Sequence, residues 1–311
     1  MSTFEPAYIE TVNKGLLENK IAKAYDALSS CTLCPRKCEV DRLSGETGIC
    51  RTREKAYVSS YNPHFGEEEP LVGTHGSGTI FFTHCNLLCL FCQNYDISHE
   101  GRGEEITDEQ LASIMLFLQN AGCHNINFVT PSHIVPQILS AVEIAVKAGL
   151  SVPLVYNSGG YDRVETLKLL EGVFDIYMPD FKFWDPEVAE ATCNAKDYPE
   201  VACKAILEMH RQVGDLVVDA SGIARRGLLI RHLVLPQDLA GTRQVMRFIA
   251  RKVSTNSYVN IMPQYRPCGR AAEIEGLSVH LSQRGYKAAL IAAKEEGVER
   301  LDSRRRAFML W

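Results

Sequence analysis

Three cysteines in the segment THCNLLCLFCQNYDIS have the spacing of ligands to an iron–sulfur cluster. Cys85 and Cys89 are separated by three residues, and Cys89 and Cys92 by two. Three thiolates can hold three irons of a [4Fe–4S] cluster, which leaves the fourth iron open to another ligand. Zinc fits less well, because three thiolates would need His84 or water to complete a tetrahedron. The plain alternative is a set of buried structural cysteines.

A second group of cysteines lies upstream in the segment CTLCPRKCEVDRLSGETGIC, and its members are Cys31, Cys34, Cys38 and Cys50. A proline and two glycines supply turns between them, as a compact metal site requires. Four thiolates can close a tetrahedral zinc site or hold a second iron–sulfur cluster, and the spacing leaves both open. The remaining cysteines are scattered; Cys123 and Cys203 are expected to be packing residues, and Cys268 lies in a loop that can face a pocket.

Composition limits the class of protein. The chain has 311 residues, of which 46% are hydrophobic and 23% charged, as in an ordinary globular protein. Its net charge of −5 gives no general attraction to nucleic acid. No apolar run approaches the ~18–20 residues that span a bilayer, and the first ten residues carry no apolar signal segment. We expect a cytoplasmic protein without nucleic-acid or membrane partners, whose clustered cysteines indicate metal binding rather than disulfides.

The first 75 residues differ from the rest and are expected to form a cysteine-rich, metal-binding extension. A short amphipathic segment, residues 8–28, leads into the upstream cysteine group. YNPHFGEEEP, residues 61–70, reads as a loop around Pro63 and Pro70. We place the boundary of the main domain, residues 76–311, at the glycine-rich segment GTHGSG.

From Gly78 onward, short β-rich runs alternate with helical segments. Expected strands span residues 78–83, 125–129, 152–156, 174–178, 228–235 and 258–262. Expected helices span residues 111–119, 134–150, 163–170, 199–212, 242–253 and 279–296. Thr107 with Gln110 predicts a capping box for the first helix, and Asp162 with Glu165 predicts a cap for the third.

This alternation predicts a parallel sheet with right-handed crossovers. An open doubly wound sheet and a barrel-like (β/α)6 sheet both fit it. The loop with Cys85, Cys89 and Cys92 follows the first strand, at the edge where α/β folds place their active sites.

The same three cysteines, with Phe91 directly before the third, match the pattern C-x3-C-x-aromatic-C. This pattern resembles the signature of the radical S-adenosylmethionine superfamily, and within it the chain is similar to pyruvate formate-lyase-activating enzymes and uncharacterised iron–sulfur relatives. The resemblance implies an α/β fold with a partial TIM barrel, (β/α)6, and an N-terminal cysteine-rich extension. It also implies a [4Fe–4S] cluster whose open iron binds S-adenosyl-L-methionine, and a radical that abstracts hydrogen. Phe91 belongs to this implied cofactor site.

Two further segments resemble cofactor-binding motifs of the activating enzymes. FDIYMPDFK resembles a segment ending in M-L-D-L-K, which implies that Asp180 and Lys182 lie in the pocket, with Asp180 near the carboxylate of S-adenosylmethionine. The plain alternative is that Asp180 caps a helix or pairs with Lys182. YNSG, residues 156–159, resembles D-T-N-G, with Tyr156 in place of the aspartate. Asn157 and Ser158 are the residues of this turn that would reach the cofactor.

One family feature is missing from the sequence. Many members carry G-G-E after the second strand to bind the amino group of S-adenosylmethionine, whereas this chain has TPSH at residues 130–133. Hydroxyls of Thr130 and Ser132, or backbone carbonyls near Pro131, are the acceptors expected to replace it. RHLVLP and IMPQY resemble later strands near the nucleoside, although His232 is more typical of a core histidine.

The resemblance implies an enzyme that abstracts hydrogen from a backbone glycine of a partner protein, a glycyl radical enzyme. It also implies a low-potential electron donor such as flavodoxin or ferredoxin. The alternative is modification of another peptide or a small molecule. A non-enzymatic iron–sulfur or zinc protein is disfavoured, because an electron carrier normally has four protein ligands on each cluster. The run Arg304–Arg306 is expected to be a solvated surface.

Overall fold

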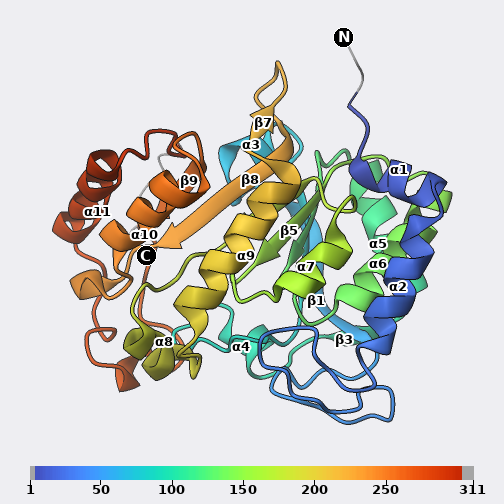
Figure 1. Ribbon diagram of the computed structural model, residues 1–311, viewed down its shortest axis with the longest axis horizontal. Coiled ribbons are helices and arrows are strands. Elements are labelled where there is room, and N and C mark those ends of the chain that lie inside the picture. The colour runs from blue at the N-terminus through green and yellow to red at the C-terminus, as the bar shows by residue number, and fades with distance from the viewer. Residues whose placement is uncertain (1–3, 303–311) are drawn as a thin grey trace.

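The computed structural model describes residues 4–302, and its centre is a twisted sheet with six parallel strands (Figure 1). In sheet order these strands are β2 (Ser77–Phe82), β4 (Ile126–Val129), β5 (Leu154–Ser158), β6 (Ile176–Pro179), β8 (Ala224–Leu233) and β9 (Tyr258–Met262). Each corresponds to one of the six predicted strands, shifted by a few residues at its ends. The predicted α/β fold with a (β/α)6 partial barrel is therefore confirmed.

Helices follow most strands and pack against the sheet. They are α5 (Asp108–Asn120), α6 (Val135–Lys147), α7 (Val164–Leu170), α8 (Pro186–Cys193), α9 (Tyr198–Val213), α10 (Thr242–Phe248) and α11 (Gln283–Glu296). A π-helical turn, Ile249–Val253, extends α10, and short 3-10 turns span Pro236–Asp238 and Ala271–Glu273. Helix α8 was not expected. No helix in residues 4–302 is long and apolar enough to cross a membrane.

The predicted capping box of α5 is confirmed. The Thr107 hydroxyl accepts a hydrogen bond from the amide of Gln110 at 3.3 Å, and the Gln110 side chain accepts one from the Thr107 amide at 2.8 Å. The predicted cap of α7 is wrong. Arg163 precedes the first residue of that helix and caps it with no side-chain hydrogen bond, while Asp162 is buried and binds three hydroxyl groups instead.

The predicted loop at residues 61–70 holds only for residues 65–68, because residues 61–64 belong to a strand and residues 69–70 begin a short helix. Strand β1 (Ala56–His64) pairs antiparallel with β2, and Pro63 lies opposite Gly78. On its other side β1 pairs with β3 (Glu104–Ile106) only over residues 56–58. Pro63 therefore sits where the strand has no second partner, so its missing N–H disrupts no ladder.

The N-terminal helices pack on helices α6 and α7, outside the sheet. The amphipathic segment forms two helices, α1 (Ala7–Asn13) and α2 (Leu16–Asp26), separated by Gly15 at φ +67°. Helix α2 packs on α6, and the Tyr8 hydroxyl donates to the carbonyl of Val152 at 2.8 Å. Residues 30–54, with the upstream cysteine group, contain no helix or strand and lie beside α4 (Tyr95–Ser98) at the bottom of Figure 1.

The two faces of the sheet bury different side chains, because successive residues of a strand point to opposite sides. One face packs on the helices through the large apolar cluster that includes Phe128, Tyr156 and Tyr177. The other face is the barrel interior, where strand residues such as Val155 and Met178 form a smaller cluster. Helix α3 (Glu69–Val72) contributes Leu71 to this inner cluster. A short strand β7 (Val217–Val218) pairs antiparallel with the start of β8.

Candidate functional site

The loop after β2 carries Cys85, Cys89 and Cys92 at the C-terminal edge of the parallel strands. Each of the three sulfur atoms accepts a hydrogen bond at 3.3 Å: Cys85 Sγ from the amide of Leu87, Cys92 Sγ from the hydroxyl of Ser98, and Cys89 Sγ from the thiol of Cys193. Burial raises the pKa of Cys85 to about 12, so this thiol stays protonated until a metal binds it. Sulfur atoms that already accept hydrogen bonds are suited to become thiolate ligands.

The three thiols fit a [4Fe–4S] cluster by their chemistry. Electrostatic interactions link Cys85 to both Cys89 and Cys92, which shows that the three lie near one another. Each thiolate would bind a different iron, and the fourth iron would keep an open position. The donor set therefore fits a [4Fe–4S] cluster.

Two further side chains lie at the cysteine loop, one from the loop itself and one from α8. Phe91 is buried, and its ring packs edge-on against Phe183 and Tyr265, with centroids 5.8 and 6.0 Å away. Cys193, at the end of α8, places its sulfur 3.3 Å from that of Cys89. Sequence reasoning left Cys193 among the scattered cysteines, and no local signal could have joined residues so far apart in the chain.

Asp180 and Lys182 lie at the end of β6, beside the cysteine loop. The Asp180 carboxylate contacts Lys182 Nζ at 2.5 Å and Arg231 Nε at 2.7 Å. Although burial opposes ionisation, the charges of Arg231 and Lys182 hold the pKa of Asp180 below its usual value. The charge of Lys182 also acts on the thiols of Cys89 and Cys92. The two predicted residues thus form one charged group adjoining the cysteine loop.

Asn157 joins the same group, whereas Ser132 and Ser158 do not. Asn157 Oδ1 accepts a hydrogen bond from Arg231 Nη2 at 2.7 Å. The two serine hydroxyls instead donate to the buried carboxylate of Asp162, at 2.6 and 2.5 Å.

The Asp162 carboxylate also accepts a hydrogen bond from the hydroxyl of Tyr156, at 3.0 Å. Asp162 therefore ties the end of β5 to the segment after β4. The sequence had suggested only a helix cap for it.

Thr130 marks the turn that follows β4. Its amide donates to the carbonyl of Asn157 at 2.9 Å, and its φ of +63° is rare for a β-branched residue. Such a conformation persists only where the surrounding structure holds it, and it is commonest at functional sites. The turn therefore places the backbone of residues 130–132 close to Asn157 and the charged group around Asp180.

Two acidic residues inside the barrel were missed by sequence reasoning. Glu67 approaches Arg231 Nη1 at 3.6 Å, and the Glu68 side chain accepts a hydrogen bond from Asn260 of β9 at 2.6 Å. Glu68 is 1% exposed, and burial raises its pKa. The segment before α3 therefore crosses from the edge near β1 and β2 toward β9. The sequence signal was a run of three acids before Pro70, to which the loop prediction assigned no role.

His232 is a core residue. Its ring nitrogens lie 2.7 Å from the carbonyl of Phe181 and 2.9 Å from the hydroxyl of Thr242, and burial lowers its pKa to about 4. Cys123 and Cys203 pack against the large apolar cluster, as expected. Cys268 is half-buried in a loop joined to the cysteine loop by a hydrogen bond from the Arg270 amide to the Leu90 carbonyl, at 2.7 Å. Arg304–Arg306 lie outside the described residues.

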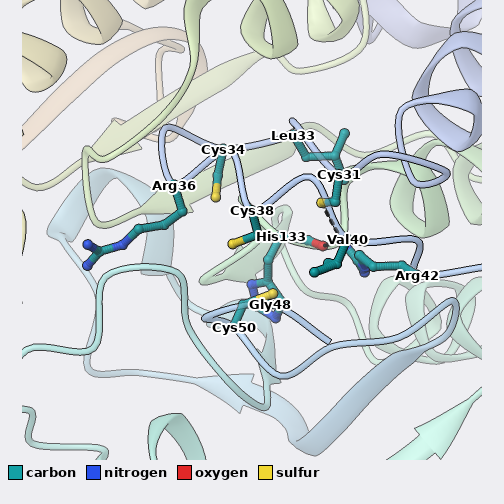
Figure 2. Close-up of a pocket in the computed structure, with 10 residues that line it drawn as sticks. All are labelled: Cys31, Leu33, Cys34, Arg36, Cys38, Val40, Arg42, Gly48, Cys50 and His133. Carbon is teal, nitrogen blue, oxygen red and sulfur yellow. Dashed lines mark hydrogen bonds between the residues drawn. The ribbon is translucent and has the colours of Figure 1, made fainter. Parts of the chain in front are cut away.

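The structure also gathers the upstream cysteine group. Cys31, Cys34, Cys38 and Cys50 line one cavity, whose wall includes His133 and Arg42 (Figure 2). Residues 30–54, which carry this group, have no regular secondary structure, so contacts with the domain hold them in place. One such contact is the hydrogen bond from Arg163 Nη1 to the carbonyl of Thr32, at 2.7 Å.

Comparisons with known proteins agree with this geometry. Residues 79–221 match the model of the Radical SAM superfamily, and this span contains the cysteine loop, Asp180 and Lys182. The chain is also 32% identical over 299 residues to the uncharacterized protein MJ0674 of Methanocaldococcus jannaschii. This match covers 94% of this chain and 82% of that protein. Radical SAM proteins are enzymes that bind a [4Fe–4S] cluster and S-adenosylmethionine. The chain described here belongs to the radical SAM superfamily.

Proposed function

We propose that this enzyme activates a partner protein by abstracting a hydrogen atom from one of its backbone glycines. The observation that carries the proposal is the placement of Asp180 and Lys182, which match the M-L-D-L-K segment of pyruvate formate-lyase-activating enzymes. Both residues lie in a charged group beside the cysteine loop. In this proposal residues 1–75 form a cysteine-rich extension of the partial-barrel domain, residues 76–311.

The cluster and S-adenosylmethionine, when bound, supply a carbon-centred radical that removes hydrogen from a C–H bond. The chain's own residues hold and orient them. Cys85, Cys89 and Cys92 bind three irons, and Lys182 presents a cation to the carboxylate of S-adenosylmethionine. Asp180 keeps Lys182 in position through their 2.5 Å contact.

In this proposal the turn after β4 binds the amino group of S-adenosylmethionine. The strained turn at Thr130 brings its hydroxyl and the carbonyls of residues 130–132 to the same edge as Asn157. Ammonium groups bind oxygen acceptors of this kind, so the turn takes the place of a Gly-Gly-Glu segment. Ser132 and Ser158 support the turn and β5 through Asp162, rather than holding the cofactor by themselves.

The proposal includes a cytoplasmic location and a low-potential one-electron donor such as flavodoxin or ferredoxin. A second candidate function is radical modification of another peptide or a small molecule. The observation that favours it is the acidic segment inside the barrel, where Glu67 and Glu68 approach Arg231 and Asn260. A small substrate with hydrogen-bond donors would find acceptors there.

The test uses the full chain, purified anaerobically and reconstituted with iron and sulfide. We expect 5′-deoxyadenosine when S-adenosylmethionine and dithionite are added, and none from Cys89→Ala. The matched control, Cys203→Ala, should retain the activity because Cys203 lies on α9, away from the cysteine loop. Failure of the parent to form 5′-deoxyadenosine would refute the assignment of radical chemistry.

The substrate is tested separately. The protein is co-purified with its partner from anaerobic cells, and the mixture is examined by electron paramagnetic resonance after reaction. A protein-based glycyl radical supports the proposal. Formation of 5′-deoxyadenosine without any protein radical would favour the second candidate.

A further inference from the structure

The upstream cysteines converge on one site although they span twenty residues of irregular chain. Cys31, Cys34 and Cys50 are 7%, 7% and 8% exposed, and Cys38 is partly exposed. Figure 2 shows their four sulfur atoms turned toward a shared space, with His133 behind them. Buried thiols gathered in this way are typical of metal sites in reducing compartments.

The chain around these cysteines is shaped to bring them together. The amide of Cys31 donates to the carbonyl of Val40 at 2.9 Å, and the amide of Ile49 donates to Cys38 Sγ at 3.4 Å. At Gly48 an added Cβ would lie 2.6 Å from both Cβ and Sγ of Cys38, so only glycine fits there. A backbone that approaches a sulfur atom so closely suits a compact metal-binding knuckle.

A buried arginine indicates that the site binds a negatively charged group. Arg42 is 1% exposed and lies 3.8 Å from Cys31 Sγ through Nη1. Its hydrogen bonds go to the carbonyls of His133 and Arg53, which are neutral, and no acidic partner of Arg42 occurs among residues 4–302. A buried charge without a counter-charge is costly. Thiolates bound to a metal would supply the missing negative charge.

The place of the site favours an iron–sulfur cluster over zinc. Four thiolates can close a tetrahedral zinc site or hold a four-iron cluster. Zinc has no redox chemistry, whereas an iron–sulfur cluster can take up and pass on an electron. A site beside the loop of Cys85, Cys89 and Cys92, whose family implies a four-iron cluster, therefore suits a second cluster.

The two cysteine loops are joined by Arg36, which lies between Cys34 and Cys38. Its side chain points away from the cavity in Figure 2 and donates to the carbonyls of Asn86 and Leu87, at 2.9 and 3.2 Å. Asn86 and Leu87 lie between Cys85 and Cys89 in the sequence. The upstream site thus adjoins the cysteine loop of the proposed active site.

We propose that Cys31, Cys34, Cys38 and Cys50 hold a second [4Fe–4S] cluster beside the first. All four irons of this cluster have a protein ligand, so it has no open iron for S-adenosylmethionine. Arg42 compensates its negative charge. The proposal is independent of the substrate proposed above.

The test measures metal content and spectra of the full chain after anaerobic reconstitution. We expect about eight irons per chain, two four-iron clusters, and no zinc. The Cys34→Ser/Cys38→Ser double variant should fall to about four irons, and the control Cys203→Ser should keep about eight. In the reduced double variant the remaining paramagnetic signal should change when S-adenosylmethionine is added.

A second variant tests the upstream cluster even if the double variant does not fold. Cys85→Ser/Cys89→Ser/Cys92→Ser leaves the upstream site intact and should retain about four irons, with a signal that ignores S-adenosylmethionine. One zinc and about four irons in the parent would overturn the proposal, as would loss of all iron in the triple variant. Neither result depends on whether 5′-deoxyadenosine or a protein radical is formed, so this proposal and the proposed function fail separately.

Discussion

Arg231 links three strands and the acidic segment, so its replacement should be one of the most destabilising single changes at this edge. Its guanidinium contacts Asp180 of the β6 end at 2.7 Å, Asn157 of β5 at 2.7 Å and Glu67 at 3.6 Å. The side chains of Arg231, Asp180 and Glu67 are 17%, 11% and 9% exposed, so water screens these contacts only weakly.

The size of the effect follows from what the change leaves behind. Breaking a buried ion pair by removing one partner costs about 3–5 kcal/mol, because the other charge stays buried and uncompensated. In Arg231→Met the carboxylate of Asp180 keeps Lys182 at 2.5 Å, which places the expected loss near the lower end, about 3 kcal/mol. Arg231→Lys keeps the positive charge but not the forked geometry, so it should lose about half as much.

The assay is urea denaturation of the anaerobically reconstituted protein, followed by far-ultraviolet circular dichroism. Arg243→Met is the control, because Arg243 is about half exposed and pairs with the equally exposed Glu295 at 2.5 Å, and at 3.3 Å with Glu296. Exposed pairs contribute no more than about 1 kcal/mol. If Arg231→Met and Arg243→Met lower the free energy of unfolding equally, the inner network does not stabilise the fold and the reasoning is refuted.

Three other predictions concern single positions. Gly160→Ala should destabilise the protein more than Gly149→Ala. Both glycines have positive φ, but only at Gly160 would the new Cβ collide with the Asp180 carbonyl. Equal shifts in melting temperature for the two variants would contradict this. Burial raises the pKa of Asp175 to about 7. The folded state therefore keeps a proton that the unfolded state has lost between pH ~4 and ~7, and the free energy of unfolding falls by up to about 1.4 kcal/mol per pH unit as pH rises. Asp175→Asn should flatten that slope in denaturation curves from pH 4 to 8, and an unchanged slope would count against the shift. Thr107→Ala should cost about 1 kcal/mol by removing the capping box of α5, and a neutral result in urea denaturation would show that tertiary contacts alone hold that helix end.

Features that depend on neighbouring residues in the chain could be predicted from the sequence. Alternation of apolar strands with capped helices predicts the parallel sheet, because hydrophobic periodicity and turn residues act over a few positions. The capping box of α5 lies within four residues, and its prediction is confirmed. The spacing of Cys85, Cys89 and Cys92 is equally local, and it predicted the family before any fold was known.

Features that depend on burial and on distant partners were decided only by the tertiary structure. Pro63 belongs to a strand because β1 has no second neighbour at that point, which its own sequence cannot show. Arg42 and Glu68 look like surface charges in the sequence, yet both are 1% exposed. Cys193 meets Cys89 across 104 positions of the chain. The sequence determines which side chains can carry a charge. Whether such a charge is solvated or is buried and needs an ionic partner depends on which segments pack over it.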